Sequence, residues 1–111
     1  MAKDEIIKLL KQYCLLLYSA GISIEKAFLF GSYAREEASD DSDIDIMIVS
    51  KDFDNNSPDS NIKAWSLTRK VDSRIEPYSV GLKQYYNDNV SPILQIVKQE
   101  GIELNIDDIK T

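Results

Sequence analysis

Histidine is absent from this sequence of 111 residues, and cysteine occurs only once. Without histidine, the chain has no imidazole base for a serine triad or a cysteine dyad. One cysteine without histidine also leaves too few ligands for a structural zinc site. Cys14 lies in an apolar helical pattern, so we interpret it as a buried small hydrophobic residue rather than a catalytic thiol. The chemistry that remains is that of carboxylates.

Long apolar runs and an excess of positive charge are missing as well. No apolar run approaches the roughly 20 residues that span a bilayer, and residues 1–5 show no signal-peptide pattern, so we expect a cytoplasmic protein without membrane contact. The 13 Lys and Arg against 19 Asp and Glu give a net charge of -6. This balance argues against general nucleic-acid binding, which relies on clustered cations. An acidic protein can still bind a triphosphate where Mg²⁺ mediates the contact.

Hydrophobic periodicity predicts helices and strands that alternate along one domain, residues 1–111. The expected helices cover 3–20, 33–38, 58–73 and 92–100, and the expected strands cover 25–30, 44–49 and 75–80, with an extended tail over 102–106. Ser57 and Ser91 each precede a proline and are expected to cap the helix that follows. Pro77 cannot donate to a ladder, so its strand should lie at an edge or be interrupted. This order indicates an α/β or α+β fold: a small mixed central sheet of three or four strands flanked by helices.

The first predicted helix is apolar over more than one face. Ile7, Leu15, Leu16 and Tyr18 lie outside its main apolar stripe. Two interpretations stay open: the helix packs on two sides within the domain, or part of it is a partner interface.

Gly31 and Ser32 directly follow the first predicted strand and precede the short predicted helix. Glycine permits a sharp turn and a close approach to a ligand, serine offers a hydroxyl, and a helix start presents free backbone amides. These are the parts of an anion site. The plainer alternative is an ordinary turn with a cap.

Asp43 and Asp45 begin the second predicted strand and point to the same face of it, since side chains alternate along a strand. Two close carboxylates are costly without a cation, so a divalent metal is the natural partner. A solvated acidic turn is the alternative. An EF-hand is excluded because Ile46 stands where that loop needs glycine, and no Gly-Lys-Ser/Thr motif follows a glycine-rich run as a P-loop requires. Glu76, at the start of the third predicted strand, is the candidate third carboxylate, as metal ligand or general base.

The segment GSYAR at 31–35 followed by SDIDIMIV at 42–49 resembles the minimal nucleotidyltransferase domain of the DNA polymerase β superfamily. The resemblance covers the whole chain. It implies the nucleotidyltransferase fold and the transfer of a nucleoside monophosphate, AMP from ATP being the expected case. The expected acceptor is a hydroxyl on a partner protein or a small molecule, with pyrophosphate as leaving group. In matching positions, Gly31 and Ser32 would hold phosphates, and Asp43, Asp45 and Glu76 would bind two Mg²⁺ ions.

Three further positions follow from the same resemblance. Arg35 matches a basic residue that could contact phosphate, and a salt bridge with a nearby acid is equally compatible with it. Glu76 stands where many members have aspartate, which weakens its assignment as a base only modestly. Glu36 stands where glycine is frequent, a departure that we expect to matter little.

The resemblance also bears on partners. Some small relatives are antitoxins that adenylylate a helical HEPN-type toxin, so a helical partner protein is plausible, and homo-oligomerisation is left open. The competing hypothesis is a catalytically silent module with the same fold that binds nucleotide or masks a partner.

Positive charge is concentrated on the third predicted helix. It is carried by Lys63, Arg69, Lys70 and Arg74. A solvated helix face is the default interpretation, and a clamp for the triphosphate is the sharper hypothesis.

Overall fold

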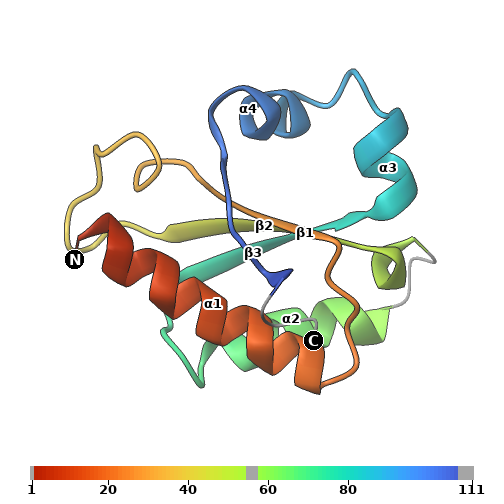
Figure 1. Ribbon diagram of the computed structural model, residues 1–111, viewed down its shortest axis with the longest axis horizontal. Coiled ribbons are helices and arrows are strands. Elements are labelled where there is room, and N and C mark those ends of the chain that lie inside the picture. Colours follow the sequence, from red (N-terminus) through yellow and green to blue (C-terminus); the bar gives the residue numbers. More distant parts are fainter. Residues whose placement is uncertain (1, 55–57, 108–111) are drawn as a thin grey trace.

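A central sheet lies between two layers of helices in the computed structural model, which describes residues 2–54 and 58–107 (Figure 1). The strands follow the order β3-β2-β1-β4. Their bounds are Lys26–Phe30 for β1, Ile44–Ser50 for β2, Ile75–Gly81 for β3 and Ile102–Glu103 for β4. β1 is antiparallel to both β2 and β4, whereas β3 is parallel to β2. The mixed sheet of three or four strands is confirmed, and the predicted tail supplies its fourth strand.

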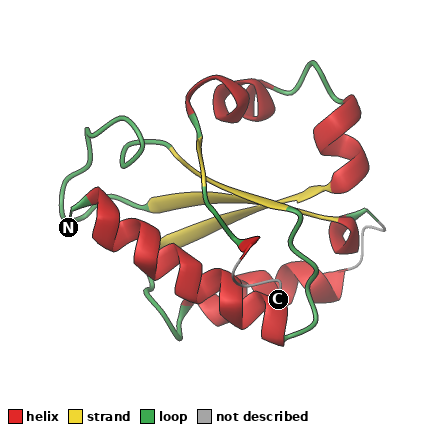
Figure 2. Ribbon diagram, viewed as in Figure 1, coloured by secondary structure: helices red, strands yellow, loops and turns green. Residues whose placement is uncertain are grey.

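The helices cover both faces of the sheet (Figure 2). Their bounds are Lys3–Ser19 for α1, Pro58–Thr68 for α2, Leu82–Asn87 for α3 and Pro92–Glu100 for α4, with a short 3₁₀ helix η1 at Lys51–Phe53. α1 and α2 lie on one side of the sheet, and α3 and α4 lie on the other (Figure 1). None of the helices in the described ranges is long and apolar enough to cross a membrane.

The alternation of side chains along β2 divides the core into two layers. Ile44, Ile46 and Ile48 pack into the cluster that includes the buried side of α1. Met47 and Val49 belong to the second cluster, with residues of α4. Any side chain that shares the alternation of Met47 therefore points to the α4 side of the sheet.

The buried side of α1 is a single stripe that contains Tyr13 and Cys14. The Tyr13 hydroxyl donates to the backbone oxygen of Ala64, which joins α1 to α2. Burial raises the pKa of the Cys14 thiol to about 12, in line with its prediction as a buried hydrophobic residue. Leu15 and Tyr18 are 50% and 44% exposed, so α1 is not packed on two sides within the described part of the chain.

Several predicted boundaries are wrong. α2 ends at Thr68, so Arg69 and Lys70 lie in the turn that follows it rather than on a helix. The hydrophobic pattern does not predict α3, because its six residues are too few to show a period. Ser91 does occupy the position before α4, but its side chain makes no capping hydrogen bond. The predicted cap at Ser57 lies outside the described residues.

The predicted helix over 33–38 is also wrong, since this segment forms successive turns. Amides donate there over three, four and five residues: Glu36 to Tyr33, Arg35 to Gly31, and Glu37 to Ser32. Glu36 interrupts any helical path because its φ of 61° lies in the left-handed region. Pro77, by contrast, lies on an edge strand as predicted.

Glu36→Gly should stabilise the protein by about 0.5 to 1 kcal/mol. The left-handed conformation is strained for glutamate and free of strain for glycine. The ion pair that the substitution removes, Glu36 to Lys3 at 3.1 Å, is largely exposed and contributes little. Urea unfolding measures the change. The matched control is Glu37→Gly in the same turn, which should destabilise by a similar amount, and equal effects of the two substitutions would contradict the prediction.

Candidate active site

Asp45 and Glu76 are direct neighbours across the parallel pair of strands β2 and β3, in the register Asp45 opposite Glu76. Neighbouring strands lie about 4.8 Å apart, and residues in such register point to the same face. Asp43 precedes Asp45 by two residues and shares its side of the chain. Asp45 in turn shares the alternation of Met47, so the three carboxylates gather on the α4 side of the sheet, at the end where β2 and β3 begin.

The charges of this group act on one another. The pKa of Asp45 is raised to about 6, first by burial and then by the negative charges of Glu76 and Asp43. Arg35 partly offsets this shift, which places its positive charge within reach of the same carboxylate. An ionised Asp45 is therefore held in an unfavourable position that a cation would relieve.

Tyr78 is a member of the site that sequence reasoning missed. Its hydroxyl donates to Glu76 Oε1 at 3.3 Å, and its ring meets the edge of Phe30 with centroids 5.1 Å apart. Burial and the nearby carboxylates raise the pKa of Tyr78, so the phenol keeps its proton for this bond. The available signal was its spacing of two residues from Glu76, which puts both side chains on one face of β3.

Gly31 lies directly against the Asp45 carboxylate. Its φ of 76° is left-handed, and a Cβ built on it would overlap Asp45 Oδ2. Glycine is therefore required here both by the turn and by the close approach. The segment from Gly31 to Ser32 thus begins beside the Asp45 carboxylate.

The turn after Gly31 presents backbone amides without the predicted helix. Its hydrogen bonds are donated by the amides of Arg35, Glu36 and Glu37. Within the described ranges, the backbone amides of Ser32 and Tyr33 donate no hydrogen bond. Successive amides in a turn form an anion-binding concavity even where no helix dipole assists.

Arg35 makes salt bridges with nearby acids, as one of its two interpretations predicts. Its Nε lies 3.3 Å from Glu37 Oε2, and its Nη1 lies 3.7 Å from Glu100 Oε1 at the end of α4. Both pairs are well exposed, so they hold the side chain only weakly. Arg35 can therefore turn toward a phosphate near Asp45, whose pKa already responds to it.

The remaining basic residues do not form a clamp for the triphosphate. Arg74 makes a bidentate ion pair with Asp72, at 3.0 Å from Nε and 2.7 Å from Nη2, which holds the pKa of Asp72 below its usual range. Lys63 donates to the backbone oxygen of Ala20, at the end of α1. Lys70 is exposed in the turn after α2.

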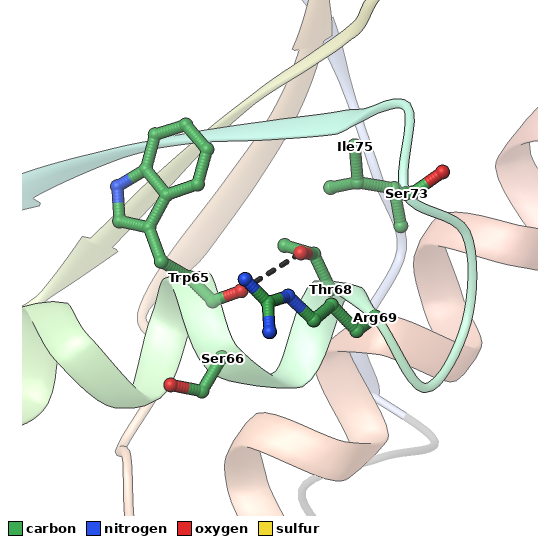
Figure 3. Close-up of a pocket in the computed structure, with 6 residues that line it drawn as sticks. All are labelled: Trp65, Ser66, Thr68, Arg69, Ser73 and Ile75. Carbon is green, nitrogen blue, oxygen red and sulfur yellow. Dashed lines mark hydrogen bonds between the residues drawn. The ribbon is translucent and has the colours of Figure 1, made fainter.

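Arg69 lines a surface cavity of about 380 Å³ beside α2 (Figure 3). The cavity is lined by Trp65, Ser66, Thr68, Arg69, Ser73 and Ile75. Ile75 belongs to the core layer on the α1 side of the sheet, opposite the carboxylates. This cavity is therefore not part of the candidate active site. A smaller hollow, of about 210 Å³, lies beside Tyr33.

The oxygen ligands of the site fit Mg²⁺ in a limited way. In residues 2–54 and 58–107, no three carboxylates, thiols or imidazoles are placed so that they could hold one ion together. Mg²⁺ commonly takes one or two carboxylates and completes its shell with water and substrate phosphates. The half-buried Asp45, with Glu76 and Asp43 beside it, suits such a shared ion. The side chains as they stand therefore match a metal bound jointly with a phosphate ligand, not one enclosed by protein alone.

Comparison with known proteins adds to this geometry. The family model described as Polymerase beta, Nucleotidyltransferase matches residues 4–109. No curated protein sequence matches the chain. A crystal structure assigned as a nucleotidyltransferase from Sulfolobus solfataricus has a TM-score of 0.64 and 19% identity, over 92% of this chain and 81% of that chain. A chain from a toxin-antitoxin structure with AMP-PNP has a TM-score of 0.58 and 24% identity, over 90% of this chain and 77% of that chain. At these identities the likeness establishes the fold.

Gly31→Ala should destabilise the protein mainly through its contact with Asp45. The left-handed φ costs about 1 to 2 kcal/mol, and the overlap with Asp45 Oδ2 adds to it. In an Asp45→Ala background the overlap disappears, so the two substitutions should show a coupling of about 1 kcal/mol in urea unfolding. Gly21 has a φ of 95° and an open space around its Cβ position, so Gly21→Ala should show no coupling to Asp45→Ala. Strict additivity of Gly31→Ala and Asp45→Ala would refute the contact.

Asp45→Asn should stabilise the metal-free protein at neutral pH. Because the folded-state pKa of about 6 exceeds the ordinary value of 3.8, the folded state binds the Asp45 proton more tightly than the unfolded state does. Stability therefore falls as pH rises from about 4 to 6 and stays lower above that window. A shift of this size would correspond to about 3 kcal/mol, and partial exposure reduces the expected gain to about 1 kcal/mol.

Urea unfolding with a chelator present, at pH 4.5 and pH 8, measures this change. The matched control is Asp41→Asn, an exposed aspartate in the preceding turn, which should change stability by less than about 0.5 kcal/mol at either pH. The same dependence on pH in the Asp45→Asn variant and the unmodified protein would contradict the assignment.

Proposed function

Since the chain belongs to the polymerase β nucleotidyltransferase family, we propose that it transfers a nucleoside monophosphate, AMP from ATP in the expected case, to a hydroxyl of an acceptor. One observation carries the proposal: Asp43, Asp45 and Glu76 gather on one face of the sheet, directly beside the turn that begins at Gly31. The backbone amides of the turn would bind phosphate oxygens, and the carboxylates next to them would bind the metal of a metal-bound triphosphate.

The turn holds the leaving end of the nucleotide. The amides of Ser32 and Tyr33 donate hydrogen bonds to phosphate oxygens in this proposal, and the Ser32 hydroxyl is a further donor. Arg35 contributes a mobile positive charge from the same turn. Gly31 lets these groups approach Asp45, so that the phosphates lie next to the carboxylates.

Glu76 is the proposed general base. Its carboxylate accepts the proton of the acceptor hydroxyl as the oxygen bonds to the α-phosphorus, and the bond from the α-phosphorus to the bridging oxygen breaks so that pyrophosphate leaves with the electron pair. The Tyr78 hydroxyl holds Glu76 Oε1 and so orients the second carboxylate oxygen to the acceptor. Asp43 and Asp45 would hold Mg²⁺, which supplies charge stabilisation to the phosphates when it is bound.

The acceptor is proposed to be a partner protein. The described residues form only the sheet and its covering helices, which leaves little structure for a private acceptor pocket. A toxin-antitoxin chain with AMP-PNP shares this fold, which supports a toxin-antitoxin role with a partner, and the helical HEPN type is the expected case. The exposed Leu15 and Tyr18 of α1 offer apolar contact for such a partner.

The second candidate function is a silent module that binds nucleotide or masks a partner without transfer. The presence of all three carboxylates disfavours it, because a domain that only binds has no use for a base. The two candidates differ in whether labelled AMP leaves the nucleotide.

Asp43→Asn should reduce AMP transfer by at least about 100-fold, because it removes a ligand that stabilises transition-state charge. The assay incubates the purified protein with Mg²⁺ and α-labelled ATP, alone and with the product of the neighbouring reading frame, and follows label on protein. Asp41→Asn carries the same change of charge two residues away and should transfer normally. Nucleotide binding without label on any acceptor would favour the silent module.

A further inference from the structure

Arg74 touches every segment that carries a candidate site residue. It lies two residues before Glu76, immediately ahead of β3. Its backbone oxygen accepts from the amide of Ile44 at 2.8 Å, and Ile44 is the residue between Asp43 and Asp45. The start of β2 and the start of β3 are thus joined at Arg74.

The side chain of Arg74 reaches the third segment, the turns between β1 and β2. Its Nη1 donates to the Tyr33 hydroxyl at 3.4 Å and to the backbone oxygen of Asp40 at 3.2 Å. Tyr33 directly follows Ser32 and is buried, and its hydroxyl also donates to the backbone oxygen of Ser39 at 3.3 Å. The guanidinium therefore holds both ends of this segment, which has no helix or strand of its own.

Asp72 fixes the direction of the guanidinium. Asp72 Oδ1 accepts from Nε at 3.0 Å and from the backbone amide of Arg74 at 2.9 Å, and Oδ2 accepts from Nη2 at 2.7 Å. With these three bonds made to one carboxylate, Nη1 points to Tyr33 and Asp40. A lysine ammonium cannot make this planar, forked arrangement.

We propose that Arg74 is a positioning residue that sets the distance between the phosphate-binding turn and the carboxylates. This inference rests on the proposed function and adds a residue that touches neither metal nor nucleotide. Its charge is already committed to Asp72, so it acts through geometry and not by attracting phosphate. Without it, the amides of Ser32 and Tyr33 lose their fixed place relative to Asp45, and each nucleotide would have to order the turn on binding.

The test compares MgATP affinity, by titration calorimetry, in the unmodified protein and in Arg74→Ala, Arg74→Lys and Tyr33→Phe. We expect about tenfold weaker binding for both Arg74 variants, and about threefold weaker binding for Tyr33→Phe, which removes only the hydroxyl that Arg74 contacts. Arg69→Ala removes a guanidinium on the other side of the sheet and should leave affinity within about twofold. Circular dichroism sets a temperature at which every variant is folded, so that lost stability alone does not change the affinity.

Normal affinity in Arg74→Lys would overturn the proposal, because charge alone would then suffice. Normal affinity in both Arg74→Ala and Tyr33→Phe would overturn it as well. If the unmodified protein does not bind MgATP, the proposed function fails instead, which separates the two failures. Limited proteolysis extends the test to that case. Arg74→Ala should still make the peptide bonds of residues 33–40 more sensitive to protease than Arg69→Ala does.

Discussion

Repulsion among carboxylates at the start of β2 and β3 is the constraint around which this domain is arranged. The parallel register forces Asp45 opposite Glu76, and the alternation of β2 adds Asp43 to the same face. A fold that kept these side chains apart would be more stable without a ligand. Burial first, and then the negative charges of Glu76 and Asp43, raise the pKa of Asp45, so a bound cation would stabilise its ionised form.

The two faces of the sheet have different roles, one in stability and one in supporting the candidate site. The face under α1 and α2 is filled by aliphatic side chains and contributes stability. The face under α3 and α4 is apolar at one end, around Met47 and Leu94, and acidic at the other. Burial of the apolar end holds β2 in place, and so it offsets the cost of the charged end. One strand thus serves both as core and as the support of the site.

The parts of the fold that follow a local pattern are predictable from the sequence. The strands around Phe30, Ile46 and Ile75 follow from buried runs of apolar residues, and the edge position of β3 follows from Pro77. The shared face of Asp43 and Asp45 needed only the period of a strand. The helix predicted over 33–38 does not form, although its residues favour a helix. Tyr33 is buried there and Glu36 is left-handed, so the segment forms turns instead. The contacts of Arg74 are also not predictable from a local pattern, because its partners Tyr33 and Asp40 are 41 and 34 residues away in sequence.

Pro77 has a consequence beyond the edge position of its strand. The bond from the Ile44 amide to the Arg74 oxygen shows that the main-chain groups of 74 and 76 point to β2, so the nitrogen of Pro77 points away from the sheet. A strand from another chain that aligned itself there would meet a nitrogen without a proton, next to Glu76. A strand from another chain, a second copy of this protein included, would therefore pair poorly with this edge of β3.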